Sequence, residues 1–301
     1  MKFKKELILA ILLGAVFPVW ALRFTKTQRN LPADSFDIIV LTDGGTISMN
    51  MQEYLTGVLL CEMPSDFEVE ALKAQAVAAR TFVLYRKENG SKHPDADICT
   101  SASCCQGYLN PESYVLSGGN TMTVLRMHDA VCATGEEVLL YDGSIIEATY
   151  FSSSGGRTED AQAVWGSAVP YLKSVNSEEQ DTTYTSEMDK RDFCTALGLQ
   201  AGEIHIDEPK YTQGGGIAEV NINGEDFTGL ELRRRLRLRS TQISFYVGKD
   251  KVQIVTNGYG HRVGMSQYGA DAMAVAGNDY RQILTHYYSG VTIGDWKSYN
   301  N

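Results

Sequence analysis

The most regular pattern of hydrophobic and polar residues lies between residues 52 and 87 and predicts two helices separated by a proline. The first apolar run, YLTGVLLCE, ends at Glu62, and Pro64 then interrupts the pattern. Beyond the proline, apolar residues recur at spacings of three and four, as on the buried face of a helix: Val69, Leu72, Ala76, Ala79 and Val83. Ser65 followed by Glu68 is the signature of a capping box at the start of the second helix.

Shorter apolar runs predict strands. FDIIVL (36–41) is typical of a single strand that ends at a turn. The segment EEVLLYDGSIIEATYF contains two apolar runs joined at Asp142-Gly143, which is a strong hairpin signal, and QISFYVGKDKVQIVT (242–256) predicts a second hairpin. Helices mixed with antiparallel hairpins predict an α+β fold rather than a parallel, doubly wound sheet.

The N-terminus has the pattern of an export signal. Three lysines precede an almost uncharged run from Leu7 to Leu22. No convincing small-x-small cleavage site follows, because Val19-Trp20-Ala21 places a bulky side chain there. Residues 1–22 therefore predict an uncleaved signal anchor, with a cleaved signal peptide as the alternative.

The anchor implies the layout of the rest of the chain. We expect a polar tether over residues 23–35, one folded domain over 36–294 and a C-terminal tail over 295–301. Everything after about residue 25 is then expected outside the cytoplasm, held at the cell membrane by a single N-terminal span.

Composition and charge narrow the function. The chain has 301 residues, of which 43% are hydrophobic, and its net charge of −10 argues against general binding of nucleic acid. One segment departs from this balance: LRRRLRLRS (232–240) holds five arginines within seven residues. A solvated helix face is the simplest interpretation, and contact with an anionic polymer is the alternative.

A histidine and several cysteines cluster between residues 92 and 108. His93, Cys99 and Cys105 offer three nitrogen or sulfur ligands, which fit a tetrahedral zinc ion with one open position. A disulfide is the main alternative in an exported protein, and an unligated loop is another. A bond between adjacent Cys104 and Cys105 would strain the backbone. Cys61, in an apolar helical run, is expected to be a small buried side chain.

Glu62 is the first candidate for catalysis. Its apolar neighbours and its place near a helix C-terminus both favour the protonated carboxyl group that a general acid at a glycosidic oxygen needs. A solvent-facing helix residue is the alternative.

Two loops, YFSSSGGRT and GYGHRVGMSQYGA, are rich in Gly, Ser, His, Gln and Tyr, which suit a sugar ring. A serine nucleophile paired with His261 is disfavoured because no G-x-S-x-G elbow is present.

Three segments together resemble the motif blocks of the stage II sporulation protein D family. They are EYLTGVLLCEMPSDFEVEALKAQAVAARTF, YFSSSGGRTED and GYGHRVGMSQYGA, and they follow in the family's order over residues 36–294. The resemblance implies a two-lobed catalytic domain with a substrate groove. It also implies a membrane-anchored peptidoglycan lytic transglycosylase of forespore engulfment, in the septal or engulfing membrane of the mother cell. Such enzymes cut the MurNAc–GlcNAc bonds of peptide-stripped glycan strands and leave 1,6-anhydroMurNAc ends.

The resemblance also implies partners and alternatives. The expected partners are the amidase stage II sporulation protein P and the membrane protein stage II sporulation protein M. Some proteins with this domain resemble amidase enhancers, so a non-catalytic, wall-binding role is one alternative. A zinc-dependent cell-wall hydrolase is the other.

Residue by residue, the resemblance makes Glu62 the general acid and base. A hydrolytic glycosidase uses two carboxylates, so a single glutamate fits a transglycosylase better. Lys73 and Arg80, on one helix face, match positions whose charges suit the muramyl lactate carboxylate. Six further residues are assigned to substrate binding by the two loop motifs: Tyr150, Ser152, Ser153, His261, Ser266 and Gln267.

The cysteine cluster resembles that of the clostridial members of the family. In those members zinc is bound at the positions of His93, Cys99 and Cys105, which leaves Cys104 as a bystander. We expect this zinc to be structural or to line the groove rather than to be hydrolytic, because no water attacks in the reaction.

Overall fold

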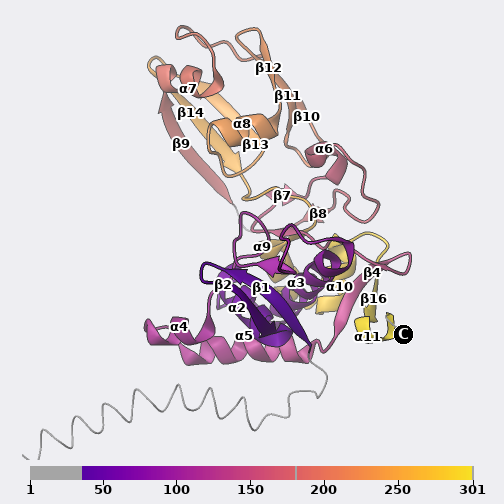
Figure 1. The fold of residues 1–301 in the computed structure, drawn as a ribbon. Coiled ribbons are helices and arrows are strands. Elements are labelled where there is room, and N and C mark those ends of the chain that lie inside the picture. The colour runs from indigo at the N-terminus through magenta and orange to yellow at the C-terminus, as the bar shows by residue number, and fades with distance from the viewer. Residues whose placement is uncertain (1–35, 180–181, 300–301) are drawn as a thin grey trace, which may run out of the picture. The chain divides into compact units, whose positions relative to one another are not determined.

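The computed structural model describes residues 36–179 and 182–299 (Figure 1). The expected anchor (1–22) and tether (23–35) lie outside these residues. Within the described ranges, no helix is both long enough and apolar enough to cross a membrane. Helices and mostly antiparallel strands alternate along the chain, which confirms the α+β prediction. The two-lobed groove stays a prediction.

The described chain forms two compact units. The first contains residues 36–67 and 83–135, and the second contains residues 68–82 and 136–299. Helix α3 (Val69–Asn89) contributes to both. Each unit is described by itself below.

The first unit combines a small sheet with packed helices. Strand β1 is central, antiparallel to β2 and parallel to β3, and α2 packs against α5. The elements are β1 (Asp37–Thr42), β2 (Gly45–Asn50), α2 (Met51–Glu62), β3 (Ile98–Cys99), α4 (Pro111–Leu116) and α5 (Thr121–Ala133). Strand β1 confirms the strand predicted over 36–41.

The helix–proline–helix prediction is confirmed by α2 and α3, but two details differ. α3 begins at Val69, so Ser65 lies in the preceding turn and does not cap it. The Ser65 carbonyl instead accepts a hydrogen bond from Arg126. Cys61 is exposed rather than buried, because it lies in the last turn of α2, where the helix leaves the apolar core.

The second unit contains the first predicted hairpin. β4 pairs with β5 through a turn in which Asp142 and Gly143 both have positive φ (48° and 75°), as a two-residue hairpin turn requires. Its elements outside the 183–257 region are β4 (Glu137–Tyr141), β5 (Ser144–Ile145), β6 (Tyr150–Phe151), β7 (Gly156–Arg157), α6 (Ala161–Trp165), β8 (Asn176–Ser177), β15 (Met265–Ser266), α9 (Gln267–Val275), α10 (Tyr280–Tyr287), β16 (Thr292–Asp295) and α11 (Trp296–Tyr299). Helix α11 falls within the segment expected to be a tail.

Residues 183–257 of the second unit build a hydrophobic core of their own. Two three-stranded sheets, β13-β14-β9 and β10-β11-β12, and two helices supply buried side chains such as Phe193, Leu232 and Ile254. The second predicted hairpin is confirmed as β13–β14. The elements are β9 (Thr183–Asp189), α7 (Lys190–Leu197), β10 (Lys210–Tyr211), β11 (Ile217–Ile222), β12 (Glu225–Phe227), α8 (Gly229–Arg235), β13 (Gln242–Val247) and β14 (Lys251–Asn257).

Candidate functional site

Glu62 is the last residue of α2 and is half-buried. The backbone N–H of Gly107 donates a hydrogen bond to its Oε1 over 2.7 Å. A Cβ atom on Gly107 would lie only 2.7 Å from this oxygen and 2.8 Å from the Cys61 sulfur. The contact therefore requires glycine at this position.

Residues 107–109 reach Glu62 because they run along α2 from its last turn back to Gly57 and Tyr54. The Tyr108 ring stacks on that of Tyr54, with centroids 5.6 Å apart, and Leu109 donates its N–H to the Gly57 carbonyl over 3.0 Å. A Cβ atom on Gly57 would lie 2.1 Å from the Tyr108 ring. A glycine in the helix and another in the crossing segment thus allow the two backbones to approach closely.

The predicted metal ligands come together in the part of the chain that precedes residues 107–109. Pairing of β3 with β1 fixes Cys99, and the Ser101 carbonyl accepts the N–H groups of both Cys104 and Cys105. His93 Nε2 lies 3.7 Å from the Cys104 sulfur and 3.5 Å from the Cys105 sulfur. One donor atom from each of the four residues lies within 4.8 Å of the other three.

These separations fit the ligand shell of a zinc ion. Zn–S bonds of about 2.3 Å and Zn–N bonds of about 2.0–2.1 Å in a tetrahedron give edges of roughly 3.6 Å between N and S and 3.8 Å between two sulfurs. The Cys104 and Cys105 sulfurs are 3.9 Å apart. Burial, with the Cys99 and Cys104 thiols close by, raises the pKa of the Cys105 thiol to about 12. A nearby cation would offset this cost of forming thiolates.

The cluster differs from the sequence-based interpretation in one respect. Cys104, expected to be a bystander, contributes its sulfur to the same group as His93, Cys99 and Cys105. The main alternative, a disulfide, is not formed, since all six cysteines carry free thiols. Soft nitrogen and sulfur donors of this kind suit zinc.

In the second unit, the two loop motifs pack on each other. β6 and β15 pair in parallel, and Ser153 and Tyr259 exchange two backbone hydrogen bonds of 3.1 and 2.7 Å. Tyr268 donates its N–H to the Ser152 carbonyl. The pairing brings together five of the predicted substrate-binding residues, of which the last three are buried: Tyr150, Ser152, Ser153, Ser266 and Gln267.

His261, the sixth of these residues, lies between two aromatic rings. The centroids of Phe151 and Trp165 are each 5.6 Å from its ring, and its Nδ1 accepts the Val263 N–H. Desolvation, reinforced by the positive charge of Arg233, lowers the pKa of His261 to about 4, although a backbone hydrogen bond at Tyr150 opposes the shift. The imidazole is therefore neutral at neutral pH and can donate or accept a hydrogen bond without charge.

Two acidic residues that the sequence analysis missed hold these loops in place. Glu179 accepts hydrogen bonds from the N–H groups of Ser154 and Gly155 and from the Ser266 hydroxyl. Glu159 is fully buried with Arg262, whose Nη1 lies 3.2 Å from its Oε1. Glu179 lies outside the three motifs. Glu159 and Arg262 lie inside two of them, YFSSSGGRTED and GYGHRVGMSQYGA, but they are 103 residues apart, and no local pattern reports their pairing.

Lys73 and Arg80 also belong to the second unit. Lys73 pairs with Glu70 at 2.6 Å and lies over the Tyr280 ring. Arg80 is only 1% exposed and donates to the Glu137 carbonyl over 3.0 Å. Its guanidinium therefore links α3 to β4 inside the unit.

The fold and these sites define an α+β protein that carries a glutamate beside a His/Cys cluster in one unit and a Ser/Gly loop paired with a Gly/His loop in the other. A sequence model of a stage II sporulation protein, SpoIID, matches residues 45–141. Stage II sporulation protein D of Bacillus amyloliquefaciens is 37% identical over 83% of this chain and 75% of its own length. The protein of the same name from Bacillus subtilis is 35% identical over 83% of this chain and 76% of its own length.

The chain therefore belongs to the stage II sporulation protein D family. It is also similar to the amidase enhancer of Bacillus subtilis, with 30% identity over 79% of this chain and 40% of that protein.

Proposed function

We propose that this protein is a peptidoglycan lytic transglycosylase that acts in sporulation, during engulfment of the forespore. The observation that carries the proposal is the position of Glu62. This residue lies in the family's first motif, and its carboxyl group accepts a hydrogen bond from the backbone of Gly107. The substrate would be the MurNAc–GlcNAc bond of peptide-stripped glycan.

One carboxyl group can perform both proton transfers of this reaction. Protonated Glu62 would give its proton to the glycosidic oxygen as that oxygen leaves C1 of the muramyl residue. The resulting carboxylate would then take the proton of the C6 hydroxyl, whose oxygen closes on C1 to form the 1,6-anhydro ring. Because both transfers occur on one face of the sugar, the carboxyl group must hold its position throughout, and the Gly107 hydrogen bond supports this requirement.

The paired loops of the second unit would position the sugar. Of the six predicted substrate-binding residues, Tyr150, Ser152 and His261 keep some exposure. Ser153, Ser266 and Gln267 are buried and would shape the loop backbone. Lys73, which is also half-buried, would supply positive charge.

Zinc held by His93, Cys99 and Cys105, with Cys104 as a fourth ligand, would have a structural role. With four protein ligands such a site is closed, which is typical of structural zinc. Gly107 follows Cys105 by two residues, so the cluster would restrain the segment that contacts Glu62.

We further propose the setting that the sequence indicates. Residues 1–22 would anchor the protein in the septal or engulfing membrane of the mother cell, with the described residues outside the cytoplasm. The amidase stage II sporulation protein P would strip the stem peptides, in a complex with stage II sporulation protein M. A non-catalytic amidase enhancer is the second candidate, supported by the similarity to the Bacillus subtilis protein of that name.

The test is mass spectrometry of the products from peptide-free glycan strands, with the full chain compared with its Glu62→Gln variant. We expect anhydromuramyl ends from the parent and none from the variant. Intact glycan from both, with stimulation of an added amidase, would support the enhancer instead. Products that carry heavy oxygen from labelled water would indicate a hydrolase, zinc-dependent if metal removal stops the reaction.

A further inference from the structure

The second unit has a cationic pocket that the function proposed above does not use. It is a cavity of about 530 Å³ formed by α8, the loop that follows it and Tyr259. Two leucines and Tyr259 line it, and no acidic residue does. The other lining residues are four arginines: Arg233, Arg234, Arg237 and Arg239. A volume of this size suits a ligand of one or two sugar rings.

The four guanidinium groups have no carboxylate partner within the described ranges. None of the ion pairs in residues 36–179 and 182–299 includes them. The charge of Arg234 acts on Glu231, but the Glu231 carboxylate accepts hydrogen bonds from Thr228 in the capping box of α8. In a chain of net charge −10, such a concentration of unneutralised arginine favours an anionic ligand.

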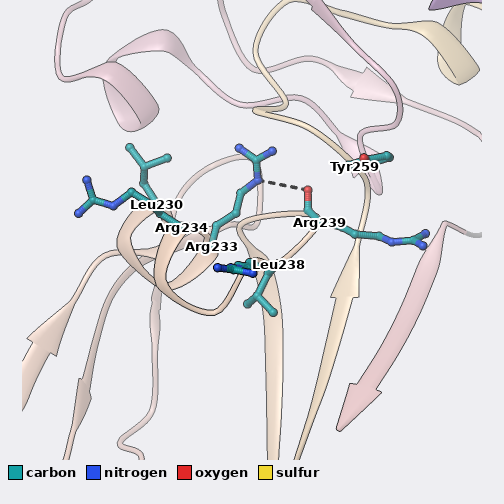
Figure 2. A pocket seen from close by; sticks show the side chains of 7 residues that line it. Leu230, Arg233, Arg234, Leu238, Arg239 and Tyr259 are labelled. Atoms are coloured by element: carbon teal, nitrogen blue, oxygen red, sulfur yellow. Dashed lines mark hydrogen bonds between the residues drawn. The ribbon is translucent and has the colours of Figure 1, made fainter. Parts of the chain in front are cut away.

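Packing fixes part of this pocket before any ligand arrives. The Arg239 guanidinium lies 3.7 Å from the Tyr184 ring centroid and 5.6 Å from that of Tyr259. Figure 2 shows Arg233 turned toward the Arg239 carbonyl, to which its Nε donates over 3.3 Å. Arg237 has a φ of 54°, a conformation that favours glycine, so the fold alone gives no reason for an arginine there.

The pocket borders the loops that are proposed to position the sugar. Tyr259 exchanges two backbone hydrogen bonds with Ser153 of the Ser/Gly loop. Gly260 donates its N–H to the Arg239 carbonyl over 3.0 Å, and the charge of Arg233 acts on His261. A strand bound by these loops would therefore pass beside the arginines.

The directions of the side chains indicate the kind of anion. Arg233, Arg234 and Arg239 fan out from one another and do not converge on one point (Figure 2). This arrangement suits a polymer with repeated charges better than a single small anion. Guanidinium forks pair with carboxylates in a bidentate manner, and the rings and leucines offer apolar surface to the faces of sugars.

We propose that this pocket binds the carboxylates of a glycan strand, with Arg234 and Arg237 as their partners. The proposal rests on the proposed function and adds a basis for substrate choice. A muramyl lactate linked to a stem peptide is a neutral amide at this atom, whereas the stripped lactate is a carboxylate. Loss of the peptide would therefore create the group that the arginines recognise.

The test is a binding measurement with the full chain in detergent, carrying Glu62→Gln so that the strand is not cut. The ligands are peptide-free glycan strands, the same strands with their carboxylates converted to methylamides, and a polyol phosphate chain. Arg234→Gln/Arg237→Gln is compared with Lys210→Gln/Lys249→Gln, which removes the same charge from exposed sites of the same unit.

We expect the arginine variant to bind the free strands about tenfold more weakly or worse, as loss of charge-assisted hydrogen bonds predicts, and the lysine variant to bind like the parent. The methylamide strands should bind weakly to all three proteins. Equal binding by the arginine and lysine variants would overturn the proposal. So would an arginine variant that loses only the polyol phosphate. If the parent with Glu62 intact forms no anhydro ends but the arginine effect persists, the proposed reaction fails and this inference stands.

Discussion

Gly107 donates its backbone N–H to Oε1 of Glu62 over 2.7 Å, two residues after the last thiol of the His/Cys cluster. This hydrogen bond joins the proposed acid to the segment that carries the proposed metal ligands. The position of the carboxyl group thus depends on residues 45 places away in the sequence.

Gly107→Ala is the most direct test of this relationship. The added Cβ would clash with Glu62 Oε1 at 2.7 Å, so we expect the proposed transglycosylase activity to fall by about 10–100-fold while the fold persists. Gly44→Ala is the matched control, because its Cβ would meet nothing closer than 3.7 Å. Activity is measured as anhydro ends formed, and folding by circular dichroism. Full activity of Gly107→Ala would show that the hydrogen bond between Gly107 and Glu62 is not needed for catalysis.

Metal content distinguishes four zinc ligands from three. If the cluster binds zinc as proposed, Cys99→Ser and Cys104→Ser should each lower the zinc content and the proposed transglycosylase activity, because each removes one sulfur from the cluster. Cys132→Ser, outside the cluster, is the control. The measurement is zinc per chain by elemental analysis, followed by a competition titration with a chelator. If Cys104→Ser keeps the parent's zinc affinity while Cys99→Ser loses it, the site has three protein ligands and an open position.

His261 predicts a pH dependence of stability. Its pKa is about 4 in the folded protein and 6.5 in the unfolded chain, so the unfolded chain binds more protons between these values. The contribution of His261 to the free energy of unfolding is therefore complete above pH 6.5 and is lost as the pH falls toward 4. Urea titrations at several pH values should show that the free energy of unfolding depends less on pH in His261→Gln than in the parent. The exposed His205 gives the control variant, His205→Gln, which should keep the parent's slope.

The buried pair of Glu159 and Arg262 should matter more for stability than a surface pair. Glu159→Gln removes the carboxylate that pairs with the Arg262 guanidinium at 0% exposure and leaves only the charge of Glu179 acting on it, so we expect a loss of about 3–5 kcal/mol. Asp160→Asn, next in the chain, breaks only a partly exposed pair with Lys173 and keeps a helix-capping side chain, so it should cost less than about 1 kcal/mol. Denaturant unfolding measures both values. Equal losses would show that solvent screens the buried pair.

The local pattern was sufficient for much of the fold. The spacing of Leu72, Ala76 and Ala79 identified α3, and Asp142-Gly143 identified a hairpin, because helix faces and tight turns depend on residues close in the sequence. The start of α3 was placed wrongly. The turn after Pro64 extends to Glu68, whose N–H is bound by Asp271, and no local signal reports so distant a partner.

The sequence by itself determined the family, the helix that ends at Glu62 and the residue types that could bind zinc, since these follow from motifs and spacing. Only the tertiary structure decided that Cys104 joins the cluster, that Gly107 binds Glu62 and that Glu179 and Glu159 hold the loops. It also decided that Arg80 is enclosed while four other arginines line a pocket. The physical reason is that a charge or a donor is defined by what surrounds it, and distant segments of the chain supply those surroundings.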